Sequence, residues 1–149
     1  MEEQAKANPD VNFVMVDEVI SDLDNVVSAT FKSEEAAYLA GLAAAYTTKT
    51  DKVGFIGGVQ VAVIEVFDAG FRQGVEDAAK ELGKEIEVVS QYAGAFDAPD
   101  KGRTIAQAMY AKDIDVIYAA AGATGNGLFQ EAKSLNEVQD EKVWVIGVD

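Results

Sequence analysis

The chain has 149 residues, 49% of them hydrophobic and 26% charged, a balance typical of one globular domain with its own core. Twelve basic and 26 acidic residues give a formal net charge of −14, which argues against binding to nucleic acid or to anionic lipid headgroups. There is no cysteine and no histidine, which excludes disulfides, thiolate metal sites, Ser-His-Asp triads and the usual zinc sites and lowers the expectation of an enzyme.

The predicted elements alternate between strands and helices. A helical segment opens the chain over residues 2–7. Apolar runs rich in Val, Ile and Phe predict strands over residues 13–16, 26–31, 53–56, 86–92, 116–121 and 143–148. Helical patterns between them predict helices over residues 33–47, 63–82, 101–111 and 126–135. This order predicts an α/β fold with a doubly wound parallel sheet, its strands covered on both faces.

Two helix ends carry capping signals, and one helix carries a regular apolar stripe. Gly83 is expected to cap the end of the second long helix, and Asp100 to be the N-cap of the third. The stripe predicts one buried helix face and consists of Val63, Phe67, Phe71, Val75 and Ala78.

Ligands of open α/β sheets bind at the carboxyl ends of the strands, so candidate residues are sought there. Gly57 and Gly58 end one strand, where either a turn needs positive φ or a cleft passes close by. Another strand leads into the glycine-rich loop 122–127, which reads G-x-x-G-x-G and matches neither the dinucleotide fingerprint nor a P-loop. The loop is either a tight turn or a place where the backbone approaches a ligand.

Three further side chains are candidates at strand ends. Tyr118, followed by three alanines, is either a core residue or a shelf on which a base stacks. Asp17 and Asp149 each follow a buried run, so each is either a helix cap or an acceptor of two ligand hydrogen bonds. Pairs of acidic residues elsewhere are interpreted as solvated charges, and no metal site is expected.

Six blocks of sequence together resemble one known family, in its order and spacing. They are residues 30–41 (TFKSEEAAYLAG), 52–58 (KVGFIGG), 67–74 (FDAGFRQG), 92–102 (YAGAFDAPDKG), 119–127 (AAAGATGNG) and 144–149 (WVIGVD). They resemble the basic membrane lipoprotein family of ABC-transporter solute-binding proteins, and they cover nearly the whole chain.

The resemblance implies a type I periplasmic-binding (LacI-like) fold, in which two α/β lobes close over a purine nucleoside and deliver it to an ABC-transporter permease. Residues 1–31 would then be the end of the first lobe and a hinge-crossing strand. Residues 32–149 would be the second lobe, incomplete at its C-terminus. The implied protein is non-catalytic, needs no cofactor, and is held by a lipid anchor on the outer face of the cytoplasmic membrane.

The resemblance also implies roles for single residues. Tyr118 would stack on the base, Asp149 would hold the ribose hydroxyls, and Asp17 would contact the base or the ribose. The loop beside the sugar would supply Gly122, Ala123, Thr124, Gly125 and Asn126, and Gly57 and Gly58 would line the cleft. Ala123 stands where the family usually has glycine, so its methyl group would narrow the ribose pocket.

Because much of the family's site is missing, the chain is interpreted as a truncated piece that binds nucleosides weakly or not at all. Two alternatives stay open. One is a flavodoxin-like cofactor binder or phospho-acceptor signalling domain. The other is a lobe fragment that forms a homodimer through its inter-lobe face or an unfinished sheet edge.

Overall fold

The computed structural model describes residues 1–148, and these residues fall into two compact units, of which the first is Met1–Lys32 and the second begins at Ser33. The smaller unit contains helix α1 (Glu2–Ala7) and two parallel strands, β1 (Phe13–Val16) and β2 (Val26–Ala29). Asn25 ties this unit together, since its side-chain amide donates to the carbonyl oxygens of Ala5, Asn8 and Val11 at 2.9–3.1 Å.

The expectation that every strand is covered on both faces is wrong for the smaller unit. Val14, Val16 and Val27 are 64%, 55% and 64% exposed. Two strands and one short helix supply too little apolar surface to cover both faces of even a small sheet. The second strand also ends at Ala29, two residues earlier than the apolar run predicts.

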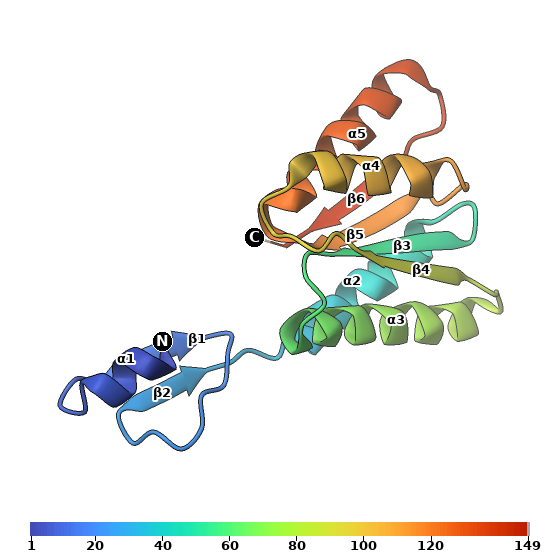
Figure 1. Ribbon diagram of the computed structural model, residues 1–149. Helices are drawn as coiled ribbons and strands as arrows, with labels where there is room; N and C mark the ends of the chain where they lie inside the picture. The colour runs from blue at the N-terminus through green and yellow to red at the C-terminus, as the bar shows by residue number, and fades with distance from the viewer. Residues whose placement is uncertain (149) are drawn as a thin grey trace. The chain divides into compact units, whose positions relative to one another are not determined.

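The larger unit is a four-stranded parallel sheet with helices on both faces. Its strands are β3 (Lys52–Gly57), β4 (Glu87–Tyr92), β5 (Val116–Ala120) and β6 (Trp144–Gly147), in the order β4-β3-β5-β6. Its helices are α2 (Ser33–Thr47), α3 (Ala62–Leu82), α4 (Pro99–Tyr110) and α5 (Gly125–Val138), with a short 3₁₀ helix, η1 (Gly122–Thr124). Helices α2 and α3 cover one face of this sheet, and α4 and α5 cover the other (Figure 1).

The central strands are buried because each carries apolar side chains toward both helical layers. On β5, Tyr118 and Ala120 face the α2–α3 layer, while Ile117 and Ala119 face the α4–α5 layer. All five residues of β5 are buried. This explains why its sequence shows a continuous apolar run and no polar alternation.

The predicted caps have different outcomes. Gly83 ends α3 with φ 65°, a left-handed conformation that glycine adopts without strain, as expected. The N-cap of α4 is Ala98, so the assignment of Asp100 to that position is wrong. Helix α4 begins at Pro99, two residues before the predicted start, where the fixed φ of proline suits the first helical position and its missing N–H would have had no partner.

Glycines bring the helices of each layer unusually close. A β-carbon built on Gly74 of α3 would lie 2.1 Å from the carbonyl oxygen of Tyr38 on α2. On the other face, a β-carbon on Gly127 of α5 would lie 1.9 Å from the carbonyl oxygen of Pro99 on α4. These helices therefore meet backbone to backbone, and any larger residue at either position would force them apart.

Candidate functional site

The candidate site lies at the carboxyl edge of the four-stranded sheet, where the predicted glycines meet. Gly57 pairs in register with Tyr92 on one side and with Ala120 on the other. Beyond the strand, the Gly58 N–H donates to the Ala120 carbonyl oxygen at 3.0 Å. The Gly94 N–H donates to the Gly58 carbonyl oxygen at 2.8 Å, which joins the loop after β4 to the same edge.

Phe96 and Phe129 are exposed aromatic residues at this edge, and Phe96 is the one that lies next to the predicted glycines. It lies in the loop between β4 and α4 and is 42% exposed. Its ring lies directly against Gly58, where an added β-carbon would be 2.3 Å from its Cδ1 atom. Glycine at position 58 is therefore explained by the close approach of this ring. Phe96 is absent from the candidates chosen from the sequence, although the region after β4 belongs to the predicted edge.

Thr124 holds the loop of Phe96 in place. Its side chain is fully buried, and its hydroxyl oxygen accepts a hydrogen bond from the Ala98 N–H at 3.0 Å. The same hydroxyl donates to the Ala95 carbonyl oxygen at 2.9 Å. The Thr124 N–H donates to the Phe96 carbonyl oxygen at 3.0 Å. The hydroxyl thus serves the loop and offers no hydrogen bond to a solute in this conformation.

Only some residues of the glycine-rich loop are exposed to solvent. Gly122, Ala123 and Asn126 are exposed, whereas Thr124 and Gly125 are buried. Gly122 has φ 53°, and a β-carbon there would lie 3.2 Å from the Phe96 carbonyl oxygen. The left-handed backbone and the close approach both favour glycine, so the tight-turn interpretation holds for this residue. Of the exposed loop residues, Gly122 lies next to Phe96.

Tyr118 lies in the core and has no open ring face. It is 3% exposed and packs against Phe71 and Phe55 with ring centroids 5.3 and 5.7 Å apart. These two neighbours belong to α3 and β3. In the described structure, Tyr118 packs in the core under the helices. This agrees with the interpretation of Tyr118 as a core residue and not with its interpretation as a stacking shelf.

Burial raises the pKa of Tyr118 from its ordinary value of 10.0 to about 12. The folded chain therefore retains this proton at a pH at which the unfolded chain has lost it. Below pH 10, we expect the titration of Tyr118 to leave the free energy of unfolding unchanged. As the pH rises from about 10 to about 12, that titration should lower the free energy of unfolding by roughly 1–2 kcal/mol. Urea unfolding at pH 9 and pH 11 checks this, with Tyr118→Phe as the variant that lacks the titrating proton. An equal loss in both proteins would contradict it.

The two predicted aspartates are placed differently. Asp17 is exposed in the smaller unit, directly after β1, with φ 63° and its N–H donating to the Ala29 carbonyl oxygen at 3.0 Å. The left-handed backbone shows that it ends the strand in a turn, a conformation that aspartate tolerates better than most residues. Asp149 lies outside the described residues. The roles of both as acceptors of ligand hydroxyls stay predictions.

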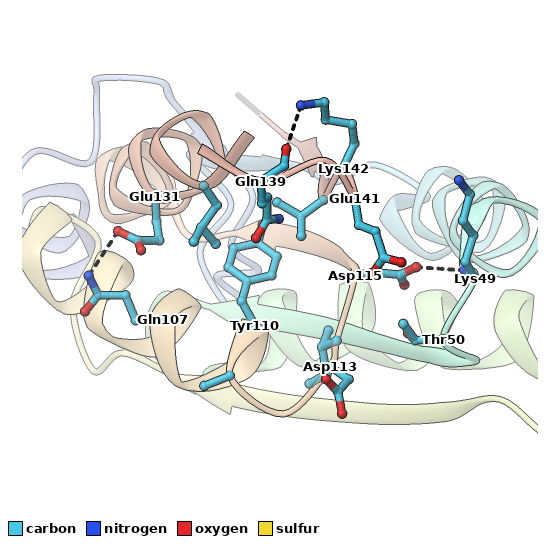
Figure 2. Close-up of a pocket in the computed structure, with 14 residues that line it drawn as sticks. Lys49, Thr50, Gln107, Tyr110, Asp113, Asp115, Glu131, Gln139, Glu141 and Lys142 are labelled. Atoms are coloured by element: carbon cyan, nitrogen blue, oxygen red, sulfur yellow. Dashed lines mark hydrogen bonds between the residues drawn. The ribbon is translucent and has the colours of Figure 1, made fainter. Parts of the chain in front are cut away.

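A pocket of about 500 Å³ opens at the opposite, amino edge of the sheet (Figure 2). None of the candidate residues lines it. Its buried carboxylates already have partners: Asp115 accepts from the Thr48 hydroxyl and from the Lys49 N–H, and Glu131 accepts from Arg103 and Gln107 at 2.7 and 3.0 Å. We interpret these polar groups as structural, because their hydrogen bonds join α5 to α4, and the start of β5 to the end of α2.

Neither a membrane-spanning helix nor a metal site is found within residues 1–148. The described helices include none that is both long and apolar enough to cross a bilayer. Within the same residues, no group of three or more acidic, histidine or cysteine side chains could hold a metal ion.

Solved structures define the class of protein. A solute-binding protein of an ABC transporter system from Aeropyrum pernix K1 superposes with a TM-score of 0.90 at 29% identity, over 98% of this chain and 42% of that one. A periplasmic ribose ABC transporter protein from Conexibacter woesei has the same fold at 18% identity, with a TM-score of 0.74. The predicted α/β fold with a doubly wound parallel sheet, as in type I periplasmic-binding proteins, is confirmed.

The family follows from sequence. The model of ABC transporter substrate-binding proteins described as PnrA-like matches residues 1–149, and the chain belongs to this family. An ABC transporter nucleoside-binding protein, BmpA, from Lactococcus lactis is 55% identical over 97% of this chain. Basic membrane protein B from Borreliella burgdorferi is 38% identical over 95% of it. The chain spans about 41% and 40% of the lengths of these two relatives.

Proposed function

We propose that this chain belongs to a solute-binding protein that captures a purine nucleoside and delivers it to an ABC-transporter permease. The observation that carries this proposal is the exposed Phe96 ring beside Gly58 at the carboxyl edge of the sheet. The similarity to a relative whose name specifies nucleoside binding supports it. Membership of a substrate-binding family favours binding without catalysis over a flavodoxin-like or phospho-acceptor domain.

In this proposal the base stacks on Phe96 and not on the buried Tyr118. Stacking of a base on an aromatic side chain contributes about 1–3 kcal/mol and needs one open ring face. Phe96 is 42% exposed, and the glycine-rich loop that is hydrogen-bonded to it would supply its exposed residues Gly122, Ala123 and Asn126 for the sugar. The resemblance further suggests that Asp17 and Asp149 accept hydrogen bonds from the ligand.

The whole protein, in this proposal, is exported, lipid-anchored at the outer face of the cytoplasmic membrane, and closes two lobes over its solute. Residues 1–31 would belong to the end of the first lobe and the hinge, and residues 32–149 to the second lobe. The described edge supplies one stacking ring, and a second surface would be needed to enclose the base. We therefore expect the chain alone to bind nucleosides weakly, and submicromolar affinity would contradict this.

The proposal is tested by following backbone amide NMR signals during titration with adenosine, guanosine, inosine and uridine. We expect saturable shifts at Gly58, Phe96 and residues 122–127 with purine nucleosides. Phe96→Ala should weaken this binding by roughly 5- to 100-fold, which removes measurable saturation from a weak complex. Phe96→Tyr retains a ring and should retain binding.

Tyr118→Phe provides the matched control in the core, because it removes only a hydroxyl from a buried ring. It should leave the titration unchanged. Shifts that persist in Phe96→Ala would place the base elsewhere. A folded chain that none of the four nucleosides perturbs would contradict a nucleoside half-site at this edge.

A further inference from the structure

Strand β4 lies at one edge of the four-stranded sheet and leads into the loop that carries Phe96 (Figure 1). Among the described strands, β4 is paired with β3 alone. A strand held by a single neighbour opens more easily than a central strand, unless side chains secure it. Helix α3 supplies such side chains, and they meet at Asp68.

Asp68 accepts hydrogen bonds from three side chains. Its Oδ1 atom accepts from the Arg72 Nε at 2.9 Å and from the Ser90 hydroxyl at 2.7 Å, and its Oδ2 atom accepts from the Tyr92 hydroxyl at 3.1 Å. Ser90 and Tyr92 belong to the second half of β4. Because the Asp68 side chain is only 13% exposed, water cannot readily replace its carboxylate. The carboxylate therefore joins α3 to the end of the edge strand.

Arg72 completes this network one helical turn after Asp68. Its Nη2 atom donates to the Ser90 hydroxyl oxygen at 2.6 Å, and its Nη1 atom donates to the Val88 carbonyl oxygen at 3.4 Å. The positive charge of the guanidinium offsets the charge of Asp68, which lowers the cost of burying that carboxylate. Three side chains and one backbone carbonyl thus form one connected network along β4.

Tyr92 connects the network to the candidate site. Its ring lies against Gly57, where an added β-carbon would be 2.5 Å from the Tyr92 Cδ1 atom. The ring also packs edge-on against Phe55, with ring centroids 6.1 Å apart. Burial and the nearby Asp68 carboxylate raise the pKa of Tyr92 to about 12, so the hydroxyl keeps the proton that it donates at neutral pH. The Tyr92 ring is therefore fixed both by packing and by its hydroxyl.

The segment from Tyr92 to Phe96 is secured at both ends. Directly after Tyr92, the Ala93 N–H donates to the Gly57 carbonyl oxygen at 2.9 Å. Phe96 is secured by Thr124, whose N–H donates to the Phe96 carbonyl oxygen at 3.0 Å. Loss of either anchor should therefore release the Phe96 ring from its place at the strand end.

We propose that Asp68 is a positioning residue for the nucleoside half-site, which holds Ser90 and Tyr92 and thereby fixes the Phe96 ring against Gly58. Asp68 does this without contacting the ligand. The inference rests on the proposed function, because the position of the ring affects affinity only if the base stacks on it. A stacking surface that is already in place avoids the cost of ordering it on binding.

Asp68→Ala tests this proposal with two readouts. Without ligand, we expect the amide hydrogens of Ala93 and Gly94 to exchange faster by roughly tenfold or more. The α-proton signal of Gly58 should also shift, because one of these protons points at the Phe96 ring and senses its ring current. In titrations with adenosine and guanosine, the dissociation constant should rise by roughly fivefold or more, toward the value for Phe96→Ala.

Asp77→Ala is the matched control on the same helix. Asp77 accepts hydrogen bonds from the Tyr38 hydroxyl at 3.3 Å and from the Gln73 amide at 3.0 Å. Its removal also deletes a carboxylate that binds a tyrosine, but this tyrosine belongs to α2 and not to β4. We expect the exchange of Ala93 and Gly94, the Gly58 signal and the affinity to stay as in the native chain.

Tyr92→Phe keeps the ring and removes only its hydrogen bond to Asp68. It should change the same readouts in the same direction, with a rise in the dissociation constant of roughly threefold. If Asp68→Ala does not fold, Tyr92→Phe decides by itself.

Three results would overturn the positioning role. They are unchanged exchange and an unchanged Gly58 signal in the folded variants, faster exchange with unchanged affinity, and equal effects of Asp77→Ala. A native chain that binds no nucleoside would contradict the proposed function instead, and the measurements without ligand would still decide whether Asp68 holds the loop of Phe96.

Discussion

Gly127→Ala is expected to lower the free energy of unfolding by about 3 kcal/mol, the upper end of the cost of overpacking a buried contact. The added β-carbon would lie 1.9 Å from the Pro99 carbonyl oxygen and 2.5 Å from the Arg103 nitrogen. Both are backbone atoms of α4, so no side-chain rotation can relieve the clash. The two helices must separate, and urea unfolding followed by circular dichroism measures the loss.

Gly125→Ala is the matched control for this prediction. It lies in the first turn of the same helix with φ −61°, and its added β-carbon would be 3.5 Å from the Ala119 β-carbon, an ordinary contact. Alanine favours helix over glycine by up to about 1 kcal/mol, so this variant should be neutral or slightly more stable. Equal destabilisation by both substitutions would show that the close approach of α4 and α5 does not set the cost.

Thr124→Val is expected to lower the free energy of unfolding by roughly 2–4 kcal/mol, although it conserves the volume of the side chain. It removes the acceptor of the Ala98 N–H and the donor to the Ala95 carbonyl oxygen, and each buried polar group left without a partner costs about 1–3 kcal/mol. Thr124 is fully buried, so water cannot replace the hydroxyl without rearrangement.

The effect of Thr124→Val should extend to Phe96, which lies between the two affected residues. We expect faster amide hydrogen exchange at Ala98 and altered NMR shifts at Phe96. Thr124→Ser keeps the hydroxyl and should retain most of the stability. If the valine variant were as stable as the native chain with unchanged exchange, the hydroxyl would not be what holds this loop.

Periodicity in the sequence determined the elements and the class of fold. The predicted helix over residues 33–47 coincides with α2, and every predicted strand of the larger unit lies within one residue of the observed one at each end. These predictions succeed because the spacing of apolar residues is a local property, imposed by 3.6 residues per helical turn and by strands buried on both faces. The alternation of strands and helices then leaves a doubly wound parallel sheet as the simplest arrangement.

The spacing of apolar residues predicts the ends of helices less accurately. Helix α5 extends to Val138, three residues beyond the prediction, because the polar residues that follow the last regular apolar position can still form helix. The predicted start of α4 is wrong because Asp100 and Pro99 are both common near helix starts, and only the backbone shows that the first turn begins at Pro99 and already includes Asp100.

Tertiary structure alone decided which aromatic ring is open to a solute. Tyr118 lies within an apolar run and Phe96 follows one, both near the carboxyl edge, and the sequence alone does not show which ring is exposed. The burial of Tyr118 depends on Phe55 and Phe71, which lie 63 and 47 positions earlier in the chain, and the position of Phe96 depends on its contacts with Gly58 and Gly122. The same holds for Leu39 and Tyr46 of α2, which are 64% and 53% exposed although they are apolar residues within a helix that packs on the sheet. Burial is a property of the packed chain, because it depends on which distant segments come together in the fold. The sequence by itself determined only the secondary structure and the apolar or polar side chains that each segment brings to that packing.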